Sequence, residues 1–307
     1  MAPRRAPRNP FKMKGCFQIA ILLLAIVCPV YAGDPHPNTL RVMSYNTWYV
    51  FAKGKAQSAG KDFVRLQSPD VVALQELTNI KAEKLKEFAA AWGHPHSCLL
   101  KTRGFSVGMT SRWPIEVIEK RLEDMHHGYL HVKSHEIHYI LVHLSPFKWE
   151  MRKRESGIIT TKVKALLAKR ERVIVLGDFN ATSEADKKWL DADKELIPKM
   201  EKSDAKHGHV QNLKDGKLDY SVMESFFNSG LVDTAKDHVP GDAAYRMSFP
   251  TGIFTDQKTP PEKGKRIDYI LSSADLYQKV KSSVIVREGV VNKISDHYPV
   301  ITNFATK

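Results

Sequence analysis

Short apolar runs rich in β-branched residues recur along the chain, and this recurrence constrains the fold more than any other feature. The runs are bounded by Gly, Pro, Asp or Ser, as strands are. Between them, 82–92 and 151–168 carry apolar residues at the three- and four-residue spacing of amphipathic helices, and no linker-like break intervenes. The mixture predicts an α/β fold, with strands at 40–45, 71–75, 105–110, 129–132, 137–144, 172–176, 267–271 and 298–304.

The order of these runs also bears on how the strands pair. Residues 105–110 and 115–118 follow one another with no helix between, and 129–144 turns near 133–135 like a hairpin. Antiparallel pairs of this kind argue against a purely parallel sheet and favour two mixed sheets packed face to face with helices outside. Residues 182–219, rich in Lys and Asp, are predicted as an excursion with one or two short helices, either a solvated decoration or a flap over the substrate.

The first 32 residues differ from the rest. Five cations precede an apolar run of 14 residues, 17–30, and the segment ends at Ala32. These are the parts of a secretory signal, whereas a bilayer span needs about 20 apolar residues. We therefore expect 1–32 to be a signal peptide, 33–307 to be the folded domain, and the protein to be secreted or periplasmic. An uncleaved membrane anchor and a lipid-modified Cys28 are the alternatives, and Met13 is a second candidate start.

Charge and cysteine content narrow the class of partner. The formal net charge is +13, and it falls to +8 without residues 1–32, which carry five cations and no anions. Such a surplus favours anionic partners such as nucleic acid, phosphorylated metabolites or lipid headgroups, with solubility alone as the alternative. Cys98 is the one cysteine of 33–307, so an internal disulfide and a zinc–thiolate site are excluded there. We interpret Cys98 as a packed small hydrophobe.

Acidic, amide and imidazole side chains stand at the ends of the predicted strands. Each alone is more typical of a turn or a cap than of a catalyst. The run Gly177-Asp-Phe-Asn180 is a stronger signal, because polar side chains at i and i+2 leave a strand on the same side. Together they predict one polar site at one end of a sheet. The set is Asn46, Glu76, His143, Asp178, Asn180, Asp268, Asp296 and His297.

These segments resemble the endonuclease/exonuclease/phosphatase superfamily of metal-dependent phosphoesterases, which has the DNase I-like fold. The resemblance runs from about Thr39 to Phe304. It implies that 33–307 is the catalytic domain and that this domain is a four-layered α/β/β/α sandwich of two mixed sheets flanked by helices. The matching segments are Ser44-Tyr-Asn-Thr, Leu74-Gln-Glu, Ser111-Arg-Trp-Pro-Ile, Val142-His, Gly177-Asp-Phe-Asn, Gly230-Leu-Val-Asp-Thr, Arg266-Ile-Asp-Tyr-Ile and Ser295-Asp-His-Tyr-Pro-Val.

The chemistry of phosphodiester hydrolysis suggests which residues hold a metal. The reaction must neutralise charge on the phosphate oxygens, supply hydroxide in line and stabilise the leaving oxygen. A hard cation such as Mg²⁺ or Mn²⁺ suits a site that is rich in carboxylates and free of thiols. We expect Glu76 to be the main ligand, with Asn46 and Asp296 supporting it directly or through water.

The remaining polar residues receive catalytic roles. Asp178 is the candidate to orient or deprotonate the attacking water, and Asn180 would donate to an oxygen of the transition state. His297 beside Asp268 would form a carboxylate-oriented imidazole, either protonated and bound to phosphate or acting as the base. His143 would protonate the leaving group or simply donate to the phosphate.

For two further groups of residues, a structural role is an alternative to a functional one. Adjacent residues on a strand face opposite ways, so we interpret His126-His127 as a surface loop and not as a metal-binding pair. The cations at 148 and 152–154 around Trp149 form either the polar face of a helix or a stripe that tracks phosphates.

Sequence leaves the phosphoester itself open. Ala181 follows Asn180 where inositol phosphatases continue differently, and no long apolar hairpin for lipid insertion is evident. Export and positive charge favour a nuclease acting on DNA or RNA. The alternatives are a lipid or small-molecule phosphodiesterase or phosphatase, sphingomyelinase-like in substrate, and, more remotely, a binding protein that has lost catalysis.

Overall fold

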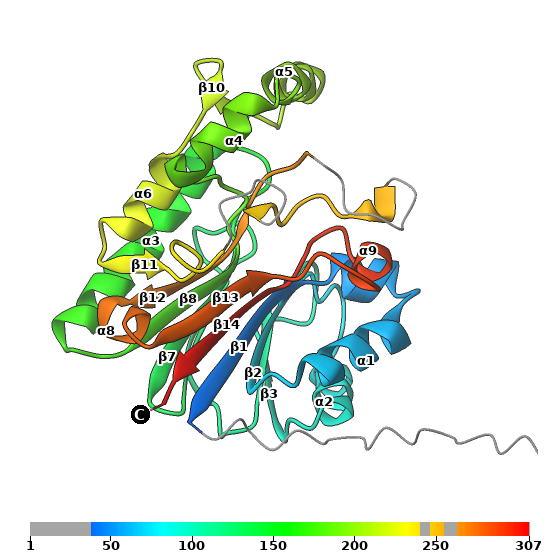
Figure 1. Cartoon of the computed structure of the whole chain (residues 1–307), viewed down its shortest axis with the longest axis vertical. Coiled ribbons are helices and arrows are strands. Elements are labelled where there is room, and N and C mark those ends of the chain that lie inside the picture. Colours follow the sequence, from blue (N-terminus) through cyan, green and yellow to red (C-terminus); the bar gives the residue numbers. More distant parts are fainter. Residues whose placement is uncertain (1–37, 240–245, 255–262, 307) are drawn as a thin grey trace, which may run out of the picture. The chain divides into compact units, whose positions relative to one another are not determined.

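Two six-stranded sheets form the centre of the computed structural model, which describes residues 38–239, 246–254 and 263–306 (Figure 1). The predicted signal peptide, 1–32, lies outside the described residues. The first sheet has the order β13 (Val280–Ile285), β14 (Val300–Ala305), β1 (Thr39–Asn46), β2 (Val71–Gln75), β4 (Gly108–Ser111) and β3 (His96–Leu99). The second has the order β11 (Leu231–Asp233), β12 (Asp268–Ser273), β8 (Val173–Asp178), β7 (Ile137–His143), β6 (Tyr129–Ser134) and β5 (Glu116–Arg121).

Both sheets are mixed, as predicted. The β1–β2 pair of the first sheet and the β7–β8 pair of the second are parallel, and the other neighbours are antiparallel. Each of the eight predicted runs overlaps a strand. The hairpin between β6 and β7 turns at His135–Glu136, slightly later than predicted, where both residues have the positive φ of a two-residue turn.

One predicted pairing is wrong. The strands from 105–110 and 115–118 do not pair with each other, because β4 pairs with β2 and β3 whereas β5 pairs with β6 in the other sheet. Pro114, which lacks the N–H that a strand ladder requires, lies in the connection where the chain crosses between the sheets.

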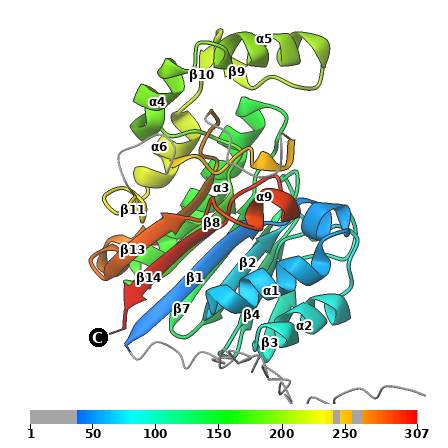
Figure 2. The same ribbon diagram turned by 45° about the vertical axis from the view of Figure 1, so that its right-hand side comes forward.

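The alternation of side chains along the strands builds the layers. In β7, Tyr139 and Leu141 belong to the core shared by the two sheets, whereas Ile140 and Val142 belong to the core beneath the outer helices. Helices α3 (Trp149–Ala168) and α6 (Ser221–Phe227) cover the second sheet, and α1 (Gln57–Gln67) and α2 (Ala82–Ala91) cover the first (Figure 2). This is the expected four-layered sandwich of helix, sheet, sheet and helix, and Cys98 is buried in its core.

The polar excursion is more structured than its sequence suggests. It contains a short turn at Glu184–Asp186, the helices α4 (Lys187–Ala192) and α5 (Leu196–Lys206), and the hairpin of β9 (Leu213–Lys214) and β10 (Lys217–Leu218). These elements lie together at one end of α3 and α6 (Figure 1). The remaining short segments are η1 (Trp48–Lys53), η3 (Gly252–Phe254), α8 (Ala274–Tyr277) and α9 (Val291–Ile294).

The segment η1 has an unusual backbone. All six of its residues have φ between 46° and 65°, and none is glycine. For L-residues a left-handed conformation costs roughly 1–2 kcal/mol per residue, so the rest of the fold must hold the segment in place. The N–H of Val50 donates to the carbonyl of Glu76 at 3.2 Å, which ties η1 to the end of β2. No helix among the described residues is both long and apolar enough to span a bilayer.

Candidate active site

Sheet topology brings the predicted polar residues to one place. Asn46 ends β1 and Glu76 follows β2, while His143 ends β7 and Asp178 ends β8, so each parallel pair delivers its carboxyl ends together. Strand β12 is antiparallel to β8, and therefore its first residue, Asp268, lies opposite Asp178. Asp296 and His297 come just before β14, which is antiparallel to β1.

Asn46 lies between the two sheets. Its side-chain nitrogen donates to Asp178 Oδ2 at 3.1 Å in the second sheet and to Glu76 Oε1 at 3.5 Å in the first. Its oxygen accepts the N–H of Trp48 at 3.1 Å. Asn46 is fully buried, so it fixes the two carboxylates relative to each other.

A carboxylate orients the imidazole of His297. Its Nδ1 lies 2.8 Å from Asp268 Oδ2, and its Nε2 lies 3.8 Å from Asp178 Oδ2 and 3.9 Å from Asp296 Oδ1. Burial alone would lower the pKa of His297, but Asp268 and then Asp178 outweigh it and raise this pKa to about 10. His297 is therefore an imidazolium at neutral pH.

The Gly177–Asn180 run packs tightly, as its sequence predicts. Gly177 has φ +143°, and a Cβ there would lie 1.9 Å from the carbonyl oxygen of Val142 on β7. The N–H of Asn180 donates to Asp178 Oδ1 at 2.8 Å, and its side-chain nitrogen donates to the carbonyl of Leu144 at 3.0 Å. Burial first, and then Asp268, raises the pKa of Asp178 to about 7.

Negative charge is poorly compensated on the Glu76 side. Burial and then Asp296 raise the pKa of Glu76, and burial raises that of Asp296. Asp296 Oδ1 is buried without a hydrogen-bond partner among the described residues. In the described part of the chain, no lysine or arginine forms an ion pair with Glu76, Asp178, Asp268 or Asp296. Such a group of oxygen ligands fits a hard cation.

A second candidate metal set overlaps the first group. Ligand atoms of Asp178, Asp268 and His297 all lie within 4.8 Å of one another, so this buried cluster could hold a metal. Binding there through Nε2 would require His297 to lose the proton on that nitrogen, whereas Nδ1 would keep its hydrogen bond to Asp268.

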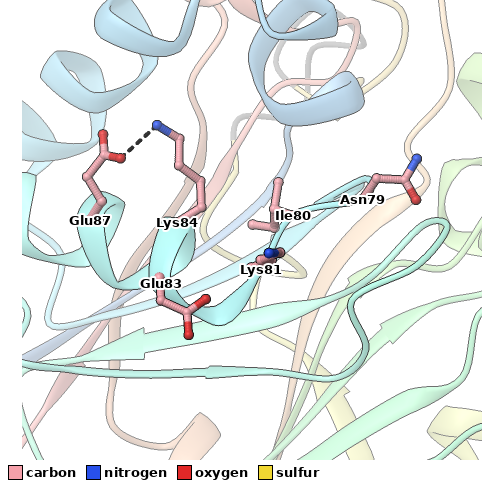
Figure 3. Close-up of a pocket in the computed structure, with 6 residues that line it drawn as sticks. All are labelled: Asn79, Ile80, Lys81, Glu83, Lys84 and Glu87. Atoms are coloured by element: carbon pink, nitrogen blue, oxygen red, sulfur yellow. Dashed lines mark hydrogen bonds and ion pairs between the residues drawn. The ribbon is translucent and has the colours of Figure 1, made fainter.

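The predicted residues converge on a pocket of about 260 Å³. Glu76, His143, Asp178, Asn180 and His297 line it, whereas Asn46, Asp268 and Asp296 do not. Asn46 and Asp268 instead bond to residues that do line it. A larger hollow of about 610 Å³ lies over the start of α2 and contains the exposed Lys84–Glu87 ion pair, but none of its lining residues belongs to the predicted site (Figure 3).

His127 was misjudged from the sequence. The segment at 126–127 is a loop, as predicted, but His127 is 6% exposed and its ring stacks on His143 at 4.2 Å and 26°. Both rings lose water on burial, which lowers the pKa of His127 to about 3 and that of His143 well below its usual value. His143 Nε2 lies 3.5 Å from Asp178 Oδ2. No periodicity marks His127, because it comes from a loop.

Two of the four cations near the start of α3 are engaged in contacts within the chain. Arg152 is 4% exposed and donates to the carbonyl of Ser145 at 3.1 Å, and Lys153 donates to the carbonyl of Ser221 at 2.8 Å. Both side chains are occupied in packing α3 against neighbouring segments.

The aromatic lining of the pocket, which comes from Tyr49, Phe105 and Phe147, was not predicted from the sequence.

Solved structures with the same fold include several nucleic-acid enzymes. An AP endonuclease from Archaeoglobus fulgidus aligns with a TM-score of 0.65 and 18% identity, over 86% of this chain and 99% of that one. A 3′ phosphatase from Neisseria, solved with a product DNA hairpin, aligns with a TM-score of 0.62 and 17% identity, over 86% and 99%. A 3′–5′ exonuclease from Neisseria meningitidis aligns with a TM-score of 0.61 and 18% identity, over 87% and 100%.

Among curated proteins, none matches the sequence. The model of the Endonuclease/Exonuclease/phosphatase family, whose members are metal-dependent, matches residues 43–297. That range holds all eight predicted site residues and most of both sheets. The chain therefore belongs to the Endonuclease/Exonuclease/phosphatase family and is a hydrolytic phosphoesterase.

Proposed function

We propose that the protein is an exported, divalent-metal-dependent nuclease that hydrolyses phosphodiester bonds of DNA or RNA by in-line attack of water. The observation that carries the proposal is the meeting of four carboxylates, two imidazoles and two amides at the strand ends of both sheets. The positive charge of residues 33–307 and the DNA-processing enzymes among the similar structures support nucleic acid as the substrate.

The metal proposed is Mg²⁺ or Mn²⁺, held by Glu76 and Asp296. In the described part of the chain no lysine or arginine forms an ion pair with either carboxylate, and the pKa of each is raised, so a bound cation would supply the positive charge that they lack. As it is oriented, Asn46 donates to Glu76 and Asp178, so it positions the ligand and supports the metal site indirectly. When bound, the cation would neutralise charge on the nonbridging phosphate oxygens.

Proton transfer is assigned to the second sheet. Asp178 is buried and its pKa is raised to about 7, which makes its carboxylate a better base for the attacking water than an ordinary aspartate. His297, charged and oriented by Asp268, donates to a phosphate oxygen and is not the base. Asn180 supplies a second donor to the same phosphate, beside Asp178.

His143 is assigned the simpler of its two predicted roles. Its ring is buried against His127 and neutral, so it donates a hydrogen bond to the phosphate and does not supply a proton to the leaving group. The position of its Nε2 near Asp178 keeps that donor on the pocket side of the site.

Hydrolysis of bis(p-nitrophenyl) phosphate by the full chain tests the reaction type. We expect release of p-nitrophenol that stops with a chelator and returns with Mg²⁺ or Mn²⁺. A Glu76→Gln protein should need far more metal for the same rate, whereas Asp268→Asn should lose rate at saturating metal. If Asp268→Asn instead shifted the metal requirement and Glu76→Gln did not, the metal would belong to the Asp178, Asp268 and His297 cluster.

A substrate panel tests the nucleic-acid assignment. Plasmid DNA, RNA, sphingomyelin and inositol phosphates would be compared at two salt concentrations. For a nuclease acting on duplex DNA, log affinity should fall by about 0.9 per log unit of salt for each phosphate neutralised. Preference for sphingomyelin or an inositol phosphate, with little dependence on salt, would contradict the proposal and leave the phosphoesterase assignment standing.

Export is a separate part of the proposal, supported by the basic and apolar composition of residues 1–32. Expression of the full chain, followed by fractionation and N-terminal sequencing, tests it. We expect a mature chain beginning at or near Gly33 outside the cytoplasm. An intact N-terminus found in the membrane fraction would support the anchor instead.

A further inference from the structure

A continuous series of aromatic and imidazole rings lines one side of the active-site pocket. Neighbouring rings contact one another from Tyr49 to Phe105 (5.0 Å between centroids), Phe105 to His127 (5.3 Å) and His127 to His126 (4.2 Å). The series continues from His126 to Phe147 (5.0 Å) and from Phe147 to His209 (5.1 Å). We call these six residues the ring wall.

The ring wall adjoins the phosphate-handling residues directly. Five of its six members line the same pocket as Glu76, Asp178 and His297, and His127 stacks on His143. His209, which follows α5 in the polar excursion 182–219, extends the wall beyond the pocket. A group attached to the reacting phosphate would therefore meet rings on this side.

The wall is held in place by buried polar contacts. Glu155 of α3 is fully buried, and its two oxygens accept the N–H of His126 at 2.7 Å and of Ser145 at 2.8 Å. The ammonium of Lys101 donates to the carbonyl of His127 at 2.8 Å. These contacts fix two ring-bearing loops before any ligand arrives, which lowers the ordering cost of binding.

Chemistry of the wall favours flat, uncharged groups. Burial lowers the pKa of both His126 and His127, so neither carries a charge that would attract phosphate at neutral pH. Tyr49 is 39% exposed, His209 is exposed, and Phe105, His126 and Phe147 are half-buried, so parts of these rings remain available. Neutral rings beside a phosphoesterase site are suited to stacking with bases.

We propose that the ring wall is a base-stacking surface and that the preferred substrate is a nucleic-acid strand whose bases are unpaired. In a duplex the base faces are covered by neighbouring bases, whereas a single strand or an extruded base presents a face for stacking. The inference rests on the proposed nuclease function and adds the class of strand that the site accepts.

The decisive experiment compares strands that differ in their bases alone. The probes are a fluorescent single-stranded oligonucleotide, the same strand with abasic interior positions, and the duplex of the first strand. The full chain should bind and cleave the base-carrying single strand best. Loss of stacking on one base should raise KM about 5- to 150-fold, with a smaller change in kcat.

Phe147→Ala is the test variant, because Phe147 joins two parts of the wall through its contacts with His126 and His209. It should lose most of the difference between the base-carrying and abasic strands. Phe254→Ala is the matched control: Phe254 is 58% exposed and contacts Trp48 at 5.5 Å, but it is not a member of the wall. The control should keep the wild-type ratio of the two strands.

Three outcomes would overturn the inference: equal or faster cleavage of the abasic strand, a preference for duplex, or the same strand ratio in Phe147→Ala as in the wild type. Inhibition of the base-carrying reaction by sphingomyelin vesicles would assign the wall to a lipid and overturn it too. Should turnover be too slow to measure, anisotropy of the three probes on the Asp178→Asn protein with Mg²⁺ gives the same ratios. If the protein hydrolyses bis(p-nitrophenyl) phosphate but does not prefer the base-carrying strand, this inference is wrong and the proposed reaction type stands. If it hydrolyses no phosphoester at all, the proposed function is wrong.

Discussion

Among the residues that the structure describes, two buried clusters of acidic residues are built in opposite ways. In the first, which we call the arginine cluster, Asp186 binds Arg246 at 2.9 Å and Arg266 at 2.7 Å, and Arg266 also binds Asp233 at 2.6 Å. Two carboxylates therefore meet two guanidinium groups. Burial alone would lower the pKa of Arg266, but Asp233 and its other neighbours raise it, so the charges are held firmly.

The second cluster, the candidate active site, has four carboxylates and no arginine or lysine paired with them in the described residues. Asp268 and Asp296 each keep a buried oxygen without a hydrogen-bond partner there. The comparison separates stability from function. A balanced cluster holds segments together, whereas the unbalanced one leaves negative charge that we propose a metal would neutralise.

The largest effect is expected for Asp178→Asn, which should lose catalytic activity. Loss of the proposed base should lower kcat by about 10²- to 10⁴-fold on bis(p-nitrophenyl) phosphate. Because the change removes one of four crowded carboxylates, the melting temperature should stay the same or rise. Asp275→Asn is the control, since its side chain is 57% exposed and pairs with Arg172 at 3.6 Å. A variant that unfolds, or one that keeps full activity, would contradict the role of Asp178.

Arg266→Met, in contrast, should lower the stability of the folded protein. It leaves Asp233 and Asp186 buried with less compensation, which should cost about 3–5 kcal/mol in the free energy of unfolding. Urea denaturation measures this loss. Arg65→Met, which removes an exposed pair with Asp62 at 3.2 Å, should cost no more than about 1 kcal/mol. Equal costs for the two variants would show that the arginine cluster does not stabilise the fold.

His94 provides a buried titratable group outside both clusters. It is 2% exposed, and its ring contacts the Thr110 hydroxyl and the Pro69 carbonyl, each at 2.8 Å. Burial lowers its pKa to about 4 in the folded state, against 6.5 in the unfolded chain. The folded state thus favours neutral imidazole, and this contribution is complete above pH 6.5 and lost as the pH falls from 6.5 to 4.

The expected loss from His94 is about 3 kcal/mol in the free energy of unfolding between pH 6.5 and 4. Urea denaturation across that range measures it. His94→Gln removes the titrating group, and its unfolding free energy should fall less steeply with pH. If the two slopes were equal, the pKa of His94 would not be lowered.

The smallest of these expected effects is the stabilisation of the folded protein by a bound metal. Mg²⁺ at 100 times its dissociation constant should stabilise the folded protein by about 2.7 kcal/mol, because the unfolded chain has no site for it. Thermal unfolding with and without Mg²⁺ measures the shift. Glu76→Gln should lose the shift, and Glu83→Gln, an exposed glutamate near the start of α2, should keep it. A shift that survives in Glu76→Gln would remove Glu76 from the metal site.

Sequence predicted the parts of this fold that depend on local periodicity. The runs at 71–75 and 137–144 became strands because their side chains are buried on both faces. Short strands such as β11 and β3 carried too little pattern to be found. The pairing of 105–110 with 115–118 was wrong because strand partners are set by where the chain crosses between sheets, and that choice is not local.

In the candidate site, too, the features that depend on local sequence pattern were predicted and those that depend on tertiary contacts were not. Polar residues that end long strands, such as Asn46 and Asp178, were predicted to converge because strand ends share an edge, and their side chains bond directly. Their catalytic roles stay predictions. The ring wall was missed, since Phe105, His127 and Phe147 come from loops that only tertiary contacts hold together. Glu155, which fixes two of those loops, reads in the sequence as one more charge on a helix.

The left-handed segment η1 gives the protein a built-in reporter of its own active site. Two of its amide protons are bonded to site side chains: Trp48 to Asn46 Oδ1 and Tyr49 to Glu76 Oε2, each at 3.1 Å. Because these two amides bond directly to side chains of the site, hydrogen exchange at them is expected to track the state of Glu76. Occupancy of the catalytic end can thus be read from the main chain without any substrate.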